Sequence, residues 1–238
     1  MIAPVDTEKS GRVRAMFARI ASRYDLLNRL MTFGRDRAWR RELISGLGPY
    51  PGGRLLDVGA GSGDLAFEAG RQFPGLTVVA CDFTAEMLAV GKTRPGAEGI
   101  LWVLADAEAL PFKRQSFDAA VSGFLLRNVT DVTHALAEQA RILNTTGRLA
   151  ALDTTPLESA WLRSPLRFYM HRVIPWLGAL LAGDRLAYQY LPESTDAFLT
   201  AEALAGMMEH IGLRGVRFVK RMFGAIALHW AYKGEQFG

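Results

Sequence analysis

The sequence predicts a single α/β domain over residues 1–238, in which helices cover both faces of a mostly parallel, seven-stranded sheet. Two observations carry this prediction. From residue 54 onward, short apolar runs alternate with amphipathic segments, and a glycine-rich turn follows the first run. Such alternation is typical of parallel strands joined by crossover helices. The length of 238 residues suffices for one such domain with a substantial core.

The N-terminal region comes first along the chain. Residues 1–9 are polar and are expected to form a loose tail, and residues 10–46 are expected to form a helical cover of two helices around a loop. The first helix is amphipathic, because four apolar side chains recur at helical spacing: Val13, Met16, Phe17 and Ile20.

Residues 54–154 are expected to form the cofactor-binding core. Apolar runs predict its five strands at residues 55–58, 76–81, 100–104, 117–122 and 148–152. One helix is expected near residues 63–72, a second follows Thr84 as its cap, and a third opens at Asp131.

The last third of the chain begins with an insertion after the fifth strand, at residues 155–198. It is rich in Trp, Arg and Pro, and a connection of this length is usually a lid or a binding element. Residues 199–233 then close the fold, with a helix at 201–210 and strands at 216–219 and 225–231.

Composition and charge exclude several classes of protein. Half of the residues are hydrophobic and 22% are charged, which is globular composition. The single cysteine, Cys81, excludes an internal disulfide framework and is compatible with a reducing cytosol. We expect neither a secretory signal nor a transmembrane helix, and therefore a cytoplasmic protein. The net charge of +4 would suit nucleic acid or an anionic membrane surface. No RNA-binding motif accompanies it, so we expect no nucleic acid.

The most informative short motif is the glycine turn within residues 55–64, which read LLDVGAGSGD. Glycines at a strand-to-helix turn let a ligand lie against bare backbone, and the next helix directs its N–H groups at that ligand. A dinucleotide fingerprint would need glycine where Asp64 stands, and Asp57 and Asp64 would repel a pyrophosphate. The turn resembles the first motif of class I methyltransferases, which implies S-adenosyl-L-methionine as the cofactor.

Acidic residues at two further strand ends extend this cofactor site. Asp82 follows the second strand, where an acid accepts both ribose hydroxyls. Asp106 follows the third strand, where the methyltransferase pattern places an acid beside the adenine amino group. The predicted cofactor-binding residues are Asp57, Gly59, Gly61, Ser62, Gly63, Asp82, Phe83, Asp106, Ala107 and Gly123.

Longer strings resemble one family, the UbiE/MenG-type C-methyltransferases of ubiquinone and menaquinone biosynthesis. The resemblance runs from about residue 12 to residue 233. In the first two thirds of the chain it rests on YDLLN at 24–28, LRNVTD at 126–131, RIL at 141–143 and GRL at 147–149. In the last third it rests on AGD at 182–184, YQYLPES at 188–194 and ALH at 227–229. The departures from the family pattern are Leu27 for Met, Asp36 for His, Gly123 for Ser, residues 144–146 (NTT) for K-P-G, Asp153 for Glu and Thr155 for Ser.

The resemblance implies a Rossmann-like class I fold and C-methylation of a polyprenyl quinol. Demethylmenaquinol and a methoxy-polyprenyl-benzoquinol are both allowed. It also implies a hydrophobic prenylated substrate. Contact with the inner face of a membrane, a homodimer and a biosynthetic complex are further options that the sequence leaves open. Residues 161–176, where aromatic and arginine side chains interleave, are either a plain cover helix or the element that contacts the membrane.

The chemistry needs a group that stabilises the quinolate, because a ring carbon attacks well only after a neighbouring hydroxyl loses its proton. Arg127 is the first candidate, and the alternative for it is a structural ion pair. Asn128 could orient the ring oxygen, and Tyr24 and Asp25 could reach the pocket from the N-terminal cover. The remaining candidates, His134, His171 and His229, lack a metal-ligand spacing, so no metal is expected.

Two other functions stay open on the sequence. One is methylation of a different aromatic metabolite, and the other is a scaffold that binds the cofactor without turnover.

Overall fold

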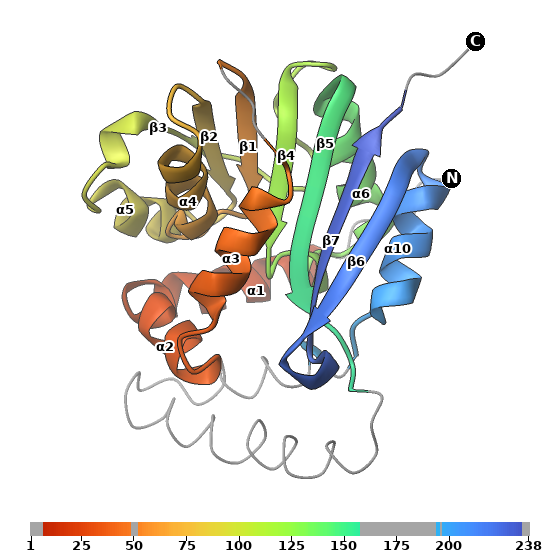
Figure 1. The fold of residues 1–238 in the computed structure, drawn as a ribbon. Helices are drawn as coiled ribbons and strands as arrows, with labels where there is room; N and C mark the ends of the chain where they lie inside the picture. Colours follow the sequence, from red (N-terminus) through yellow and green to blue (C-terminus); the bar gives the residue numbers. More distant parts are fainter. Residues whose placement is uncertain (1–6, 49–51, 158–193, 196, 235–238) are drawn as a thin grey trace.

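The computed structural model describes residues 7–48, 52–157, 194–195 and 197–234. Its sheet has the order β3-β2-β1-β4-β5-β7-β6, and β7 alone runs antiparallel to its neighbours (Figure 1). The strands are β1 (Arg54–Val58), β2 (Thr77–Asp82), β3 (Ile100–Leu104), β4 (Phe117–Gly123), β5 (Leu143–Thr154), β6 (Leu213–Arg221) and β7 (Ile226–Lys233). The prediction of a mostly parallel sheet of seven strands is confirmed.

Helices cover the two faces of this sheet separately. The helices α3 (Asp36–Ser45) and α4 (Asp64–Gln72) bury apolar side chains against one face, and α6 (Val132–Ile142) and α10 (Ala201–His210) do so against the other. The central strands are apolar toward both faces, since Leu55 and Leu56 point to opposite sides and are both fully buried. This is expected of parallel strands that helices cover on both faces.

The N-terminal cover has more helical structure than the sequence predicted. It consists of α1 (Thr7–Ile20), the short 3-10 helix η1 (Ala21–Arg23), α2 (Tyr24–Met31) and α3. Helix α1 already begins at Thr7, so the expected loose tail does not extend to residue 9. Phe33 and Gly34 adopt positive φ values of 52° and 71° and separate α2 from α3. The expected loop lies at this turn, but the expected first helix is divided at η1 into α1 and α2, so the cover has three α-helices rather than two.

Helix α5 (Ala85–Lys92) supports the cover. It lies beside β2 and β3 and buries Met87 in one apolar cluster with Val13, Met16, Phe17 and Ile20 of α1. The predicted apolar face of the first helix is thus the face that packs on the core.

Two local predictions need correction. Helix α5 begins directly after Thr84, but the Thr84 hydroxyl has no hydrogen-bond partner among the described residues, and the Thr84 N–H instead donates to Asp82 at 2.8 Å. Strand β5 begins at Leu143 rather than at residue 148. Leu143 already pairs with Phe117, and Asn144 donates a hydrogen bond to Asp118, so the chain passes from α6 into the sheet without a separate turn.

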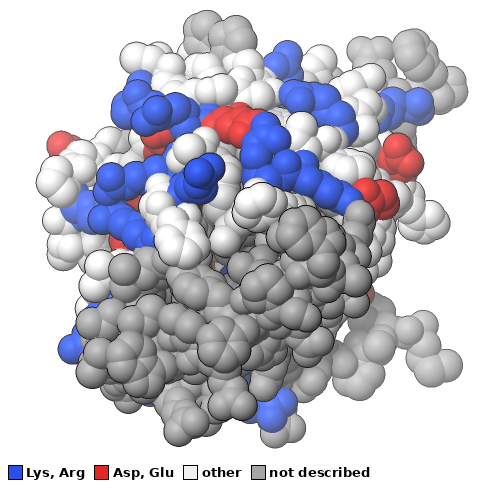
Figure 2. Space-filling model, turned by 60° about the horizontal axis from the view of Figure 1, so that its bottom comes forward, with Lys and Arg blue, Asp and Glu red and all other residues white. Residues whose placement is uncertain are grey.

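Positive side chains gather on one face of the molecule. Figure 2 shows a band of Lys and Arg side chains, with Asp and Glu sparse among them, on the face that the lower end of Figure 1 presents when it is turned forward. Most of the insertion at 155–198, including residues 161–176, lies outside the described residues. No helix within the described ranges is long and apolar enough to cross a membrane.

Candidate active site

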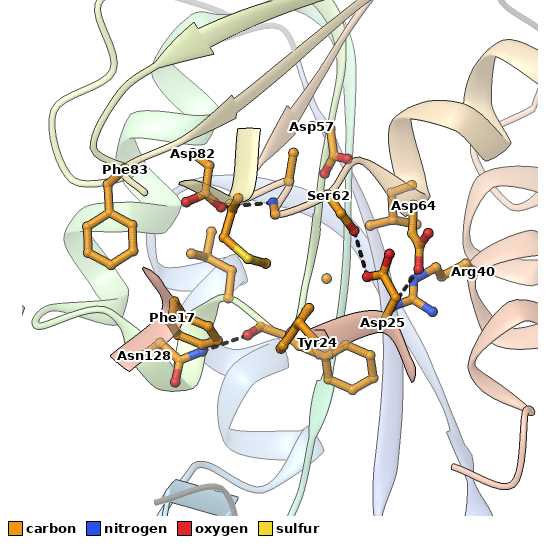
Figure 3. A pocket seen from close by; sticks show the side chains of 18 residues that line it. Phe17, Tyr24, Asp25, Arg40, Asp57, Ser62, Asp64, Asp82, Phe83 and Asn128 are labelled. Carbon is orange, nitrogen blue, oxygen red and sulfur yellow. Dashed lines mark hydrogen bonds and ion pairs between the residues drawn. The ribbon is translucent and has the colours of Figure 1, made fainter. Parts of the chain in front are cut away.

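A cavity lies where β1, β2 and β4 end, under the helices of the N-terminal cover (Figure 3). The cover contributes Phe17, Tyr24, Asp25 and Arg40 to its lining. The sequence-predicted residues that line it are Tyr24, Asp57, Gly59, Gly61, Ser62, Asp82, Phe83, Gly123 and Asn128. In open α/β sheets, ligands bind outside the carboxyl ends of the strands, which is where this cavity is.

The glycine turn connects β1 to α4 and forms one wall of the cavity. Gly61 has a φ of +57°, and a Cβ at this position would lie 2.9 Å from Met87 Cε. Gly63 has a φ of +89°, and a Cβ there would lie 2.5 Å from the Trp102 ring. Gly61 therefore keeps backbone accessible to the cavity, whereas Gly63 does not line the cavity and serves close packing of the turn against β3.

Asp57, at the end of β1, is a buried carboxyl group with spare hydrogen-bonding capacity. Its Oδ2 accepts a hydrogen bond from the Ala66 N–H at 2.9 Å, but its Oδ1 has no partner among the described residues. Burial raises the pKa of Asp57 from 3.8 to about 8, although the Ala66 N–H and Arg40 act in the opposite direction. A cation bound in the cavity would find here an acceptor with no competing partner.

Asp82, at the end of β2, braces the glycine turn. Its Oδ2 accepts a hydrogen bond from the Gly61 N–H at 2.8 Å, and its Oδ1 accepts one from the Thr84 N–H. Burial raises the pKa of Asp82, while these backbone donors lower it. Each carboxylate oxygen can accept a second hydrogen bond. The role of Asp82 as a ribose acceptor therefore stays a prediction that this geometry allows.

A chain of ion pairs ties the cover to the glycine turn. The Ser62 hydroxyl donates to Asp25 at 2.6 Å, and Arg94 lies 3.7 Å from Asp25 and 2.8 Å from Asp64. On the far side of Asp64, Arg40 Nη2 lies 3.4 Å from its Oδ2. Burial acts to raise the pKa of Asp64, but Arg40 and Arg94 together hold it below its ordinary value.

The predicted catalytic residues occupy different positions. Tyr24 lines the cavity with its ring edge against Phe17, and burial raises the pKa of its hydroxyl. Asn128 also lines the cavity and donates a hydrogen bond to the Phe124 carbonyl at 2.8 Å. Arg127 does not line it.

Arg127 instead forms a buried ion pair behind the cavity wall. Its Nη1 lies 2.6 Å from Asp153 Oδ1, and its backbone N–H donates to Asp153 Oδ2 at 3.3 Å. Its Cζ lies 5.2 Å from the ring centroid of Phe124, which does line the cavity. The structural ion pair that the sequence left open is therefore present, and Arg127 Nε has no hydrogen-bond partner among the described residues.

Asp106 and Ala107 lie away from this lining. Asp106 is exposed, and its side chain accepts the Glu108 N–H at 2.9 Å. Within the described residues the histidines form no cluster with other metal-ligating side chains. His229 is buried in β7 with Nε2 2.9 Å from the Ala201 carbonyl, whereas His134 is exposed on α6. His171 lies outside the described residues. The expected absence of a metal stays a prediction.

Sequence reasoning missed several side chains of the cavity, among them Phe17, Arg40, Leu65, Met87, Phe124 and Leu125. Phe17 was assigned to the core, and Arg40 and Phe124 were not singled out. The available signal for Arg40 was its position four residues after Asp36 on a helix, where the two side chains form an ion pair.

Comparison with known proteins decides the family. The ubiE/COQ5 methyltransferase family matches residues 5–233. The chain belongs to the ubiE/COQ5 methyltransferase family. The ubiquinone/menaquinone biosynthesis C-methyltransferase UbiE of Desulfotalea psychrophila is 41% identical over 94% of this chain and 92% of its own length. The demethylmenaquinone methyltransferase of Thermus thermophilus is 42% identical over 90% of this chain and 98% of its own length.

Solved structures of methyltransferases share the fold of this family member. A Thermotoga maritima SAM-dependent methyltransferase superposes with a TM-score of 0.64 at 19% identity, covering 93% of this chain and 99% of its own. A putative methyltransferase from a Haloferax volcanii complex with Trm112 superposes with a TM-score of 0.66 at 16% identity. The match covers 92% of this chain and 98% of that methyltransferase. The predicted Rossmann-like fold is confirmed, and the chain is a methyltransferase.

Proposed function

We propose that this methyltransferase transfers a methyl group from S-adenosyl-L-methionine to a ring carbon of a prenylated quinol. The observation that carries the proposal is the cavity itself, in which the glycine turn meets the Asp57 carboxyl group, whose Oδ1 has no hydrogen-bond partner among the described residues. The relatives named for ubiquinone/menaquinone and demethylmenaquinone methylation support the quinol class. Demethylmenaquinol and a methoxy-polyprenyl-benzoquinol are both compatible with it.

The residues of the cavity fit this cofactor. Asp57 Oδ1, buried and without a partner among the described residues, suits a cationic ligand. Gly61 leaves open the space that a side chain would fill, and Phe83 offers an aromatic face beside Asp82. When bound there, S-adenosyl-L-methionine supplies an activated methyl electrophile, so the protein mainly aligns the reactants and excludes water.

The protein's own task is to favour the quinolate. The bound cofactor would supply the methyl group to the ring carbon and keep the electron pair of the broken bond to sulfur. The ring-carbon proton then passes to the former quinolate oxygen, by way of solvent, which restores the aromatic quinol. Arg127 lies behind the Phe124 ring, so it reaches the quinolate oxygen only past that ring; there it stabilises the quinolate through donors that Asp153 leaves available, and Asn128, which lines the cavity, orients the ring. Tyr24 closes the cavity from the side of the cover.

Arg127 provides the test of this chemistry. We expect Arg127→Met to lower turnover of a short-tailed demethylmenaquinol at least a hundredfold, while the affinity for S-adenosylhomocysteine changes less than threefold. Product mass and calorimetric titration measure the two effects.

The control addresses folding, because removing one partner of a buried ion pair destabilises by about 3–5 kcal/mol. Arg127→Lys retains the charge next to Asp153 and should fold, yet it should still turn over at least tenfold more slowly, because an ammonium cannot reproduce the guanidinium fork. Wild-type turnover in Arg127→Lys would show that Arg127 only holds Asp153. Methylation of soluble phenols but not of the quinol would point to another aromatic substrate.

The proposal includes reversible contact with the inner face of a membrane, where a prenylated quinol resides. Residues 7–45 carry ten Lys and Arg against four Asp and Glu. Of the four acids, Asp25, Asp36 and Glu42 are ion-paired to arginines. The exposed face of the cover is therefore strongly positive, which suits anionic headgroups.

A further inference from the structure

Arg40 is the only cation among the described residues that line the cavity. Four carboxyl groups line the same cavity, those of Asp25, Asp57, Asp64 and Asp82. Figure 3 shows Arg40 beside Asp64 and Asp25, at the end of the cavity where the glycine turn meets the cover. The lining therefore has four acidic side chains and one basic side chain.

Arg40 is anchored from behind, on its own helix. It donates a hydrogen bond to Asp36, one turn earlier in α3, and Asp36 also accepts a hydrogen bond from the Thr32 hydroxyl at 3.0 Å. All three side chains are buried. Burial acts to lower the pKa of Arg40, but the carboxylates of Asp64 and Asp36 raise it above its ordinary value. The guanidinium therefore stays positively charged.

The side of Arg40 that faces the cavity retains hydrogen-bonding capacity. Asp36 is the only acceptor to which it donates among the described residues, and a guanidinium has five N–H donors. Asp64 lies 3.4 Å from Nη2 as an ion-pair partner, but Asp64 receives its hydrogen bond from Arg94. The planar guanidinium group of Arg40 is therefore held at the cavity wall with N–H donors available to a ligand.

We propose that Arg40 binds the carboxylate of the cofactor's methionine end and so determines specificity for an amino-acid-bearing adenosine. This rests on the proposed function. The methionine end is a zwitterion: its ammonium and the neighbouring sulfonium suit the acidic lining, while its carboxylate needs a cation. Arg40 meets that need in the geometry that guanidinium groups use for carboxylates. Since α3 carries Arg40, the N-terminal cover is part of the cofactor site.

The test compares three ligands that differ only at the methionine end. S-Adenosylhomocysteine has both ammonium and carboxylate, S-adenosyl-3-thiopropylamine keeps the ammonium alone, and 5′-methylthioadenosine lacks both. Calorimetric titration of the full chain should show that Arg40→Gln weakens binding of S-adenosylhomocysteine at least tenfold. The other two ligands should change less than threefold. Arg40→Lys should fall in between, since it keeps the charge without the fork.

Arg94→Gln is the matched control. It removes a positive charge from the same network, but Arg94 does not line the cavity. We expect it to alter the affinity for all three ligands by the same factor. If Arg40→Gln also weakens all three equally, Arg40 has only a structural role and the inference is wrong.

Folding is controlled by a second variant, because Arg40→Gln leaves Asp36 buried without its partner. The double variant Asp36→Asn, Arg40→Gln replaces the ion pair by two neutral amides and should give the same selective loss. An unselective loss in the folded double variant also contradicts the inference. Failure of the wild-type chain to bind any of the three adenosine ligands would contradict the proposed function itself, and the two failures are therefore distinguishable.

Discussion

Asp57 shows at the residue scale how burial raises the pKa of a carboxyl group and makes stability depend on pH. Its pKa is about 8 in the folded protein, because the carboxylate would be buried at the end of β1, where Oδ1 has no hydrogen-bond partner in the described part of the chain. The ordinary value is 3.8. Between about pH 4 and pH 8 the folded chain therefore keeps a proton that the unfolded chain has released. The free energy of unfolding contributed by this group falls as pH rises through that window and levels off above it.

Because the contribution of Asp57 to the free energy of unfolding falls as pH rises, the variant Asp57→Asn should have a different pH dependence from the wild type. The amide cannot ionise, and its oxygen can still accept the Ala66 N–H, so the variant should lose this part of the pH dependence. We expect the free energy of unfolding of the variant, relative to wild type, to rise between pH 5 and pH 8 by at most about 1.4 kcal/mol per pH unit. Urea unfolding at four pH values measures it, and parallel curves for the two proteins would contradict it.

At the scale of elements, the cover is held to the core by two kinds of contact. Helix α1 buries an apolar face against Met87 of α5. Asp25, at the start of α2, accepts a hydrogen bond from Ser62 in the glycine turn and lies near Arg94 beyond α5. These polar contacts of Asp25 hold its neighbour Tyr24 at the cavity.

We therefore predict that Asp25→Ala loosens α2 without unfolding the core. Amide hydrogen exchange in residues 24–31 should become at least tenfold faster, and S-adenosylhomocysteine should dissociate faster. Exchange in β1 and β4 should not change, because their hydrogen bonds lie within the sheet. Ser62→Ala, which removes the hydrogen bond but keeps the Asp25 charge near Arg94, should have a smaller effect in the same direction. Unchanged exchange in α2 of both variants would mean that apolar packing alone holds the cover.

The same elements show what the sequence could and could not predict. The strands and the glycine turn are local signals, since apolar runs, turn glycines and strand-end acids such as Asp57 and Asp82 fall within short windows. Parallel topology then brings those acids to one edge of the sheet. Arg40 on α3 and Phe124 just after β4 meet only in the folded chain, with Arg40 Cζ 5.8 Å from the Phe124 ring, and no local pattern encodes that contact.

Arg127 illustrates a different limit. The string LRNVTD indicated its importance, but not that Asp153 on β5 would hold its guanidinium behind Phe124. Strand β5 was predicted too short for a similar reason: Asn144 joins the sheet through a hydrogen bond to Asp118, a contact between residues 26 positions apart.

At the scale of the whole molecule, charge is distributed unevenly. The chain has a net charge of +4, whereas residues 7–45 alone have ten basic and four acidic residues, so the remainder is slightly acidic. Phe17, Tyr24, Asp25 and Arg40 of this positive region line the cavity. Leu26, Phe33 and Phe223 are 52%, 68% and 77% exposed. Exposed apolar tips next to arginines are typical of surfaces that contact the boundary between headgroups and acyl chains.

The last prediction concerns binding to vesicles. Arg35→Gln with Arg37→Gln removes two exposed positive charges from the cover, and each is worth about 1 kcal/mol at an anionic surface, so binding should weaken roughly tenfold to thirtyfold. Sedimentation with vesicles of phosphatidylcholine containing one-third phosphatidylglycerol measures it, and added salt should weaken wild-type binding as well. Arg54→Gln with Arg114→Gln is the matched control, because it lowers the net charge equally at the amino ends of β1 and β4, opposite the cavity. The control should bind like wild type, since screening confines the attraction to charges near the surface. Equal weakening in both double variants would mean that net charge alone drives binding and that the cover does not face the membrane.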